Sequence, residues 1–158
     1  MGYRKIAMPD RNLLAQMLKT TIFKTLDSGS VDSLREMLEF CQADAGECIR
    51  ECGDERYALY IIVSGSAHLS LPNSTESFAG LEAGDVFGML AILFKCESGF
   101  DVYADAQTQF LMIDAATMRM LEVSNPQLAL AMLRAIRTSL SPIICKAIPS
   151  ISRLTTIS

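Results

Sequence analysis

Residues 46–71 read GECIRECGDERYALYIIVSGSAHLSL, and this stretch decides the fold. It holds three short runs rich in strand-forming residues, at 47–51, 59–63 and 67–71. Gly46, Gly53 and Gly65 bound these runs. Glycine suits sharp corners because it adopts positive φ without a Cβ clash. Strands this short, separated by turn residues, are typical of a β-sandwich or a β-barrel.

Similar short runs follow at 78–81, 102–104 and 110–113, and helical periodicity flanks the whole strand-rich region. Before it, apolar stripes predict helices over 13–18 and 31–38, with Asp10 and Ser30 as N-caps. After it, Asp114 is expected to cap a helix over 115–122, and Asn125-Pro126 to begin another that reaches Leu140. The predicted class is therefore α+β, mainly β, with helices at both ends.

The length of 158 residues favours a single domain. We assign residues 1–20 to an N-terminal helix, 21–140 to the main domain and 141–158 to a C-terminal tail. The tail shows no clear hydrophobic periodicity and contains two prolines, so poor order is expected there.

The composition excludes several classes of partner. Half of the residues are hydrophobic, 20% are charged, and the net charge is −4, so the basic surface that nucleic acid or anionic lipid requires is missing. No apolar run approaches the ~20 residues of a membrane span. The five cysteines, an odd number without a C-x-x-C pair, fit a reducing compartment, and Met1–Arg11 lacks the apolar core of a secretory signal. We expect a cytoplasmic protein.

The residues with catalytic or metal-binding chemistry are few and scattered. His68 is the only histidine and stands at a polar-facing position of an alternating run, where a surface role is expected. No nucleophile has an adjacent base. Cys48 and Cys52 lie on one predicted strand, about 13 Å apart at ~3.3 Å per residue, too far to share a metal ion or a disulfide. We expect no enzymatic activity, no metal and no cofactor.

Five landmarks of the sequence occur in an order known from one family. They are Gly46-Glu47-x-Ile49, Gly53-Asp54, Leu59-Tyr60-x-Ile62-x-x-Gly65, Leu81-x-x-Gly84-Asp85-x-Phe87-Gly88 and Leu111-x-Ile113-Asp114. Together these residues resemble the cyclic-nucleotide-binding domain family, which includes catabolite-activator-type regulators, kinase regulatory subunits and gated channels. The resemblance covers about residues 20–140. It implies a double-stranded β-helix, a jelly-roll-like β-roll, between N-terminal and C-terminal helices.

The same resemblance implies a phosphate-binding cassette after the Phe-Gly pair at 87–88. In the family, a Glu directly after this pair accepts a hydrogen bond from the ribose, and an Arg about ten residues later pairs with the phosphate. Here Met89 stands at the Glu position, and the Arg position falls at Ser98 or Gly99. No arginine occurs between residues 56 and 119. The cassette is therefore degenerate: its apolar frame is present and both polar contacts are absent.

Several positions are candidates for whatever ligand contact remains. The candidate ligand-binding residues are Phe87, Gly88, Met89, Leu90, Ala91, Lys95, Ser98, Gly99 and Val102. Lys95 is a candidate replacement for the missing Arg, and a solvated loop lysine is the alternative interpretation. The apolar side chains of Met89, Ile92, Leu93 and Phe94 are expected to fill the pocket from inside.

We therefore predict a non-catalytic regulatory or interaction module that does not bind cAMP or cGMP in the usual way. The alternative is a ligand sensor that binds a cyclic nucleotide or another small molecule in an atypical manner. A protein partner or a second copy of the chain is expected. The predicted homodimer interface lies on the helix Pro126–Leu140 and consists of Leu128, Met132, Ile136 and Leu140, although the same stripe also suits packing in the core alone.

Overall fold

The computed structural model describes residues 2–21, 23–74 and 76–139. Its strands are β1 (Tyr3–Lys5), β2 (Glu39–Ala43), β3 (Cys48–Arg50), β4 (Ala58–Ser64), β5 (Ser66–Ser70), β6 (Ser77–Glu82), β7 (Val86–Phe87), β8 (Asp101–Ala104) and β9 (Thr108–Asp114). Its helices are α1 (Arg11–Leu18), α2 (Ser28–Met37), α3 (Met89–Phe94) and α4 (Ala115–Ser124), and a last helix is described over residues 126–139.

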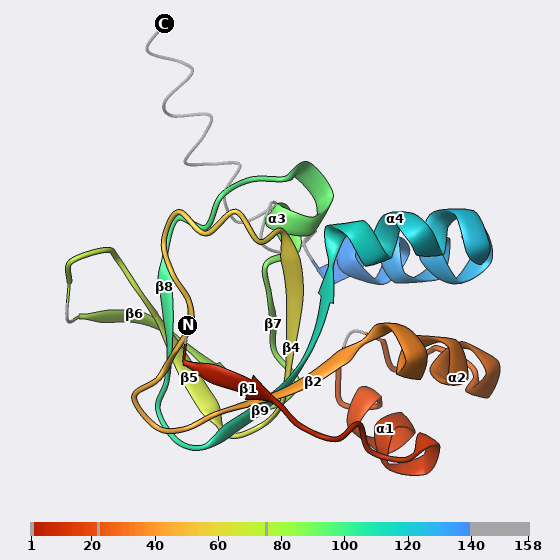
Figure 1. The fold of residues 1–158 in the computed structure, drawn as a ribbon, viewed down its shortest axis with the longest axis horizontal. Helices are drawn as coiled ribbons and strands as arrows, with labels where there is room; N and C mark the ends of the chain where they lie inside the picture. The colour runs from red at the N-terminus through yellow and green to blue at the C-terminus, as the bar shows by residue number, and fades with distance from the viewer. Residues whose placement is uncertain (1, 22, 75, 140–158) are drawn as a thin grey trace, which may run out of the picture.

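Two antiparallel sheets form the β-roll, and most of the helices lie at one end of it (Figure 1). One sheet has the order β1-β2-β9-β4-β7, and the other has the order β3-β8-β5-β6. Helices α1, α2 and α4 pack against the five-stranded sheet, and α3, which follows β7, lies near the start of α4 (Figure 1). The predicted fold class, α+β and mainly β with helices at both ends, is confirmed.

Strand β4 is buried on both faces. Its residues from Ala58 to Ile62 are all solvent-inaccessible. Leu59 and Ile61 face the helices, and Ala58, Tyr60 and Ile62 face the other sheet, as the alternation of a strand requires. Burial on both faces explains why this segment is a continuous apolar run rather than an alternating one.

The N-caps of the helices agree with the sequence in three places and disagree in one. Asp10, Asp114 and Asn125 each accept a hydrogen bond from the main chain three residues later, as expected of caps. The prediction of Ser30 as a cap is wrong. Asp27 caps α2 instead, because its Oδ1 accepts a hydrogen bond of 2.7 Å from the Ser30 amide, and the helix begins at Ser28.

Three strands were not predicted, and each is short or depends on distant partners. Strand β1 lies within the segment assigned to an N-terminal helix, and it pairs with β2. Strand β2 pairs with β9 across about seventy residues of chain, and β7 has only two residues. Residues 141–158, assigned to a tail, lie outside the described residues.

Gly65 has a φ of 88° and offers a test of the roll's tightest corner. A Cβ at this position would lie 2.5 Å from the Gln107 carbonyl oxygen and 2.7 Å from the Thr108 Cα. Gly65→Ala is therefore expected to lower the free energy of unfolding by about 2–4 kcal/mol, measured by urea denaturation.

Gly46→Ala is the matched control. Gly46 has nearly the same φ, 85°, but nothing lies within 4 Å of its virtual Cβ. Only the backbone strain remains, about 1 kcal/mol. Equal losses in the two variants would show that the contact at Gly65 is relieved by a shift of its neighbours.

Candidate functional site

The predicted cassette is formed by β7, helix α3, the loop 95–100 and β8. Helix α3 begins directly after Gly88, which is its N-cap and has a φ of 85°. A Cβ at Gly88 would overlap the carbonyl oxygen of Ala58 on β4 and would lie 3.0 Å from Nη1 of Arg50. Glycine is required here because the cassette starts in contact with the most buried strand of the sheet.

The apolar side chains of α3 do not fill the space between the sheets, so this prediction is wrong. Met89, Ile92 and Leu93 pack against the core between the five-stranded sheet and the helices. Phe94 is 68% exposed. Leu90 is also largely exposed, whereas Ala91 is buried. The helix therefore turns its apolar face to the helical core, in accordance with its spacing.

The structure places the other predicted cassette residues in different surroundings. The Ser98 hydroxyl donates a hydrogen bond of 2.6 Å to the carbonyl oxygen of Phe100, so its own loop uses it. Gly99 has open space around it, and Val102 is buried on β8 opposite Arg50. Lys95 ends α3 in the left-handed conformation and is exposed.

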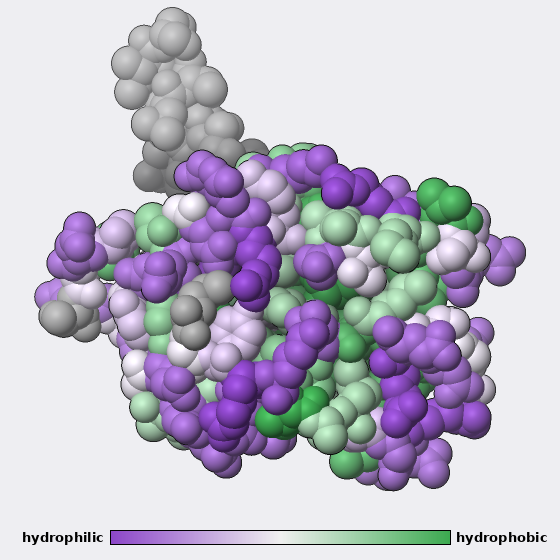
Figure 2. All heavy atoms as spheres, viewed as in Figure 1, coloured by the Kyte–Doolittle hydropathy of each residue, from purple (hydrophilic) through white to green (hydrophobic). Residues whose placement is uncertain are grey.

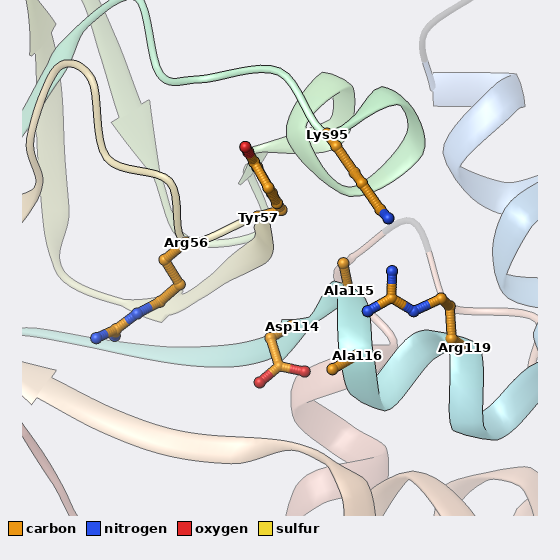
Figure 3. Close-up of a pocket in the computed structure, with 7 residues that line it drawn as sticks. All are labelled: Arg56, Tyr57, Lys95, Asp114, Ala115, Ala116 and Arg119. Carbon is orange, nitrogen blue, oxygen red and sulfur yellow. The ribbon is translucent and has the colours of Figure 1, made fainter.

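Lys95 lines a cavity of about 310 Å³ together with Arg56, Tyr57, Asp114, Ala115, Ala116 and Arg119. Figure 3 shows the Lys95 and Arg119 side chains extending toward each other, while Arg56 points away from them. Lys95 therefore belongs to a cationic hollow between α3 and α4.

The residue that sequence analysis missed is Arg50, on β3. It is only 2% exposed, and its Nε and Nη2 have no hydrogen-bond partner. The guanidinium carbon lies 5.7 Å from the centre of the Tyr60 ring. Tyr60 in turn stacks on Phe87 with ring centres 4.6 Å apart and planes nearly parallel. Arg50 therefore reaches from a strand to the start of the cassette.

A bulge explains why two successive residues of β3 are buried. The register between β3 and β8 shifts between Cys48 and Arg50, and both Ile49 and Arg50 are inaccessible. A β-bulge breaks strict alternation because its extra residue re-aims a side chain. The local sequence contains no signal for such a shift, since it arises from pairing with β8.

Other buried polar atoms in this neighbourhood also lack partners. Tyr60 Oη has none, and neither does Oδ2 of Asp54, whose Oδ1 accepts from the Arg56 amide. Burial raises the pKa of Tyr60 from 10.0 to about 12, and the nearby Arg50 charge partly opposes this rise. The phenol is therefore a hydrogen-bond donor at neutral pH.

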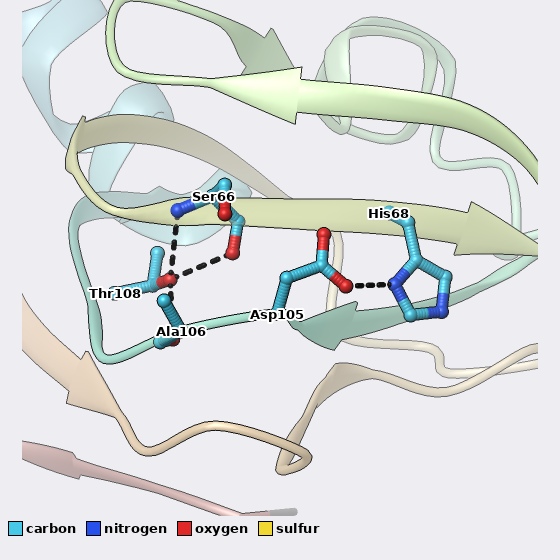
Figure 4. Close-up of polar contacts among 5 residues, drawn as sticks. All are labelled: Ser66, His68, Asp105, Ala106 and Thr108. Atoms are coloured by element: carbon cyan, nitrogen blue, oxygen red, sulfur yellow. Dashed lines mark hydrogen bonds and ion pairs between the residues drawn. The ribbon is translucent and has the colours of Figure 1, made fainter.

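A second hollow lies at the far edge of the four-stranded sheet and has acidic walls. Its volume is about 400 Å³, and it is lined by Ser66, Ala67, Gly80, Leu81, Glu82, Asp85 and Asp105. Nearby, His68 Nδ1 lies 2.5 Å from Asp105 Oδ1, and Thr108 Oγ1 bridges the backbone of Ser66 and Ala106 (Figure 4). These contacts fasten β5 to the segment before β9, which is a structural role.

Within residues 2–139, apart from 22 and 75, no group of three or more His, Cys, Asp or Glu side chains could hold a metal ion. In the same part of the chain, no helix has both the length and the apolar character to cross a bilayer. The four described cysteines are free thiols.

The predicted dimer-interface residues are located in the core. Leu128, Met132 and Ile136 are buried against the helical side of the five-stranded sheet, and Leu140 lies outside the described residues. A partner has no access to these three side chains in this arrangement. Leu130 on the same helix is exposed.

A β-roll with a short helix between β7 and β8, flanked by helices, defines a class of regulatory sensor domain. The sequence model of the cyclic nucleotide-binding domain matches residues 40–124, and this chain belongs to that family.

The similar proteins include channels, enzymes and isolated domains. A putative potassium channel protein of Rhodopseudomonas palustris is 27% identical over 116 residues, which are 73% of this chain and 28% of that protein. Glutaminase 1 of Bradyrhizobium diazoefficiens is 37% identical over 89 residues, 54% of this chain and 14% of the glutaminase. The chain thus spans less than a third of either relative.

Solved structures support the fold. A cyclic nucleotide-binding domain from Methylobacillus flagellatus matches 99% of this chain and 89% of its own with a TM-score of 0.75 and 16% identity. The catabolite activator protein of Thermus thermophilus matches 85% of this chain and 62% of its own with a TM-score of 0.69 and 23% identity.

The burial of Tyr60 predicts a pH dependence of stability. Because the folded state holds the phenol in its neutral form, the stabilisation is complete below pH 10 and is lost as the pH rises through about 12. The wild-type free energy of unfolding should fall, relative to that of Tyr60→Phe, by on the order of 2–3 kcal/mol across this window. Denaturant titrations at a series of pH values measure the difference.

Tyr60→Phe keeps the ring stack and removes only the hydroxyl. Cys41, whose pKa burial raises to about 11, is present in both proteins, so its own titration contributes to both curves. If the free energies of unfolding of wild type and Tyr60→Phe depend on pH in the same way, the raised pKa of Tyr60 is contradicted.

Proposed function

We propose that this domain is a non-catalytic regulatory module of the cyclic-nucleotide-binding type that does not bind cAMP or cGMP in the usual way. One observation carries the proposal: the cassette supplies neither a carboxylate after Gly88 nor a guanidinium near Ser98. Met89 packs into the helical core, and the Ser98 hydroxyl is engaged by its own loop. Neither side chain can perform the role that the family assigns to its position.

The size of the missing interactions supports a loss of ordinary affinity. Removing one member of a desolvated charge pair costs roughly 2–5 kcal/mol. Losing the acceptor for a sugar hydroxyl adds about 1–3 kcal/mol. Since about 1.4 kcal/mol is a factor of ten, a micromolar site becomes millimolar or weaker.

The matched relatives suggest the setting in which such a module acts. A putative potassium channel protein and a glutaminase each contain a region like this chain as a small part of their length. We infer that the module regulates or contacts another protein or domain. The exposed side chains of α4 and of the last helix suit such a contact.

Calorimetry with cAMP and with cGMP tests the proposal. Neither nucleotide is expected to give saturable heat at micromolar concentration, because the two strongest polar contacts are missing. Clear micromolar binding of either one would refute the proposal.

A double variant separates two causes of weak binding. Met89→Glu with Ser98→Arg restores both side chains to a frame that still contains Gly88, Ala91 and Val102. A gain of cAMP affinity would assign the loss to the missing contacts. No gain would mean that the pocket has a different shape from that of its relatives.

We also propose that the module self-associates through the helix over 126–139. Hydrophobic residues are exposed on the helical half of the molecule, and hydrophilic ones cover much of the sheet half (Figure 2). Met120 and Val123 on α4, together with Leu130, are among the exposed apolar side chains. Burial of such side chains between two copies would stabilise a dimer.

Sedimentation at a series of concentrations measures this self-association. Leu130→Ser is expected to shift the equilibrium toward the monomer, because it removes exposed apolar surface from the proposed contact. Gln127→Ser, an exposed polar change on the same helix, is the control and should leave the equilibrium unchanged. A strict monomer in the wild type at the highest concentration would overturn the proposal.

A further inference from the structure

We propose that Arg50 gives the β-roll a binding site for a compact oxyanion of the phosphate type, held from strand β3 and not from the cassette loop. The inference deepens the proposed function, because it names a ligand class for the same altered pocket. It starts from the burial of the guanidinium, which is 2% exposed and has two nitrogens without partners.

A buried guanidinium without an anion is an unstable arrangement. Arginine keeps its positive charge in proteins, and an unpaired charge in the interior is strongly unfavourable. The stacking contact with Tyr60 compensates only in part, since cation–π contacts are weak beside the desolvation of an ion. Arg50 takes part in none of the ion pairs formed among the described residues.

Two acidic residues of the segments around β3 are already engaged in hydrogen bonds with the main chain. Asp101 Oδ1 accepts from the Cys52 amide at 2.7 Å, and Asp54 Oδ1 accepts from the Arg56 amide at 2.8 Å. Asp54 still has one oxygen without a partner, but that oxygen forms no ion pair with Arg50. Among the described residues, no ion pair thus neutralises the guanidinium.

The surroundings of Arg50 favour an acceptor that is small and rich in oxygen. Nη1 lies against Gly88, and the Tyr60 hydroxyl is a second buried donor without a partner. Both groups are buried donors without a partner, and a planar guanidinium fork fits the oxygens of a phosphate. The guanidinium lies beside the Tyr60 ring, which in turn stacks on Phe87.

Entry of such a group requires movement of the loop that follows α3. Two hydrogen bonds hold the segment after β3 to this region: Gly53 N donates to Ser98 O in the loop, and Cys52 N donates to Oδ1 of Asp101 at the start of β8. Both connect the segment after Arg50 to the cassette. Binding at Arg50 would therefore strain or rearrange these bonds.

Thermal unfolding with inorganic phosphate, compared with chloride at equal ionic strength, is the first test. Phosphate is expected to raise the melting temperature of the wild type and to shift the Nε–H signal of Arg50 in NMR spectra. Arg50→Met should bind phosphate about tenfold or more weakly, because the charged fork is gone. Without added anion, Arg50→Met should melt above the wild type, since an apolar side chain of similar length replaces an unpaired buried charge.

Two further variants locate the effect. Arg4→Met removes an exposed arginine that pairs with Asp44 and should leave phosphate binding as in the wild type. Loss of phosphate binding in Arg119→Met but not in Arg50→Met would place the ion in the cationic hollow and overturn the inference. A lower melting temperature of Arg50→Met without anion would also overturn it, because Arg50 would then have an internal partner.

Parallel titrations with cAMP and cGMP keep the two proposals separable. Phosphate binding that depends on Arg50, with no nucleotide binding, supports both. Micromolar nucleotide binding that depends on Arg50 supports the site and refutes the proposed function. If the wild type shows neither a phosphate-dependent melting shift nor a change in the Arg50 signal, the inference fails and the proposed function is unaffected.

Discussion

The burial of β4 on both faces is the constraint on which the rest of the structure depends. One face packs on the helices through Leu59 and Ile61, and the other packs on the second sheet through Tyr60 and Ile62. Such a strand can only lie inside a sheet, and it does, between β9 and β7. Because Tyr60 is paired with Phe87, the position of β4 also fixes where the cassette begins.

The contact between β4 and the cassette limits what can change in this pocket. The Ala58 carbonyl leaves no room for a side chain at Gly88, so α3 must start against the sheet. From there α3 turns Met89 and Ile92 to the helical core. The residue that follows Gly88 can thus lose its carboxylate without disturbing the fold, because an apolar side chain finds a place on the other side. This tolerance supports the proposal that the cassette keeps its frame while its polar contacts differ.

The sequence predicts the features that are local, and the structure adds those that depend on distant pairing. Gly46, Gly53 and Gly65 occupy turns with positive φ, and Asp10 and Asp114 cap helices, because each needs only its neighbours. The same local reasoning predicted Ser30 as the N-cap of α2. The helix begins at Ser28, and the side chain of Asp27 accepts the hydrogen bond from the Ser30 amide. Arg50 could not be assigned to the interior, because a charged residue in a short strand is ordinarily exposed and the bulge that buries it arises from pairing with β8. The apolar residues of α3 were assigned to the wrong side, because their periodicity shows that they are buried but not which core covers them.

The position of the guanidinium determines how this domain could transmit a signal. In the family's arrangement the arginine belongs to the cassette loop, so a bound anion pulls directly on that loop. Here the guanidinium belongs to β3, whose pairing with β8 holds it in the four-stranded sheet. An anion bound at Arg50 as proposed would act on the cassette from the sheet side, among others through the hydrogen bonds from Gly53 to Ser98 and from Cys52 to Asp101. Such hydrogen bonds are weaker than a direct charge contact. The proposed site would therefore give the loop a small differential free energy, which corresponds to a modest adjustment and not to an all-or-none switch.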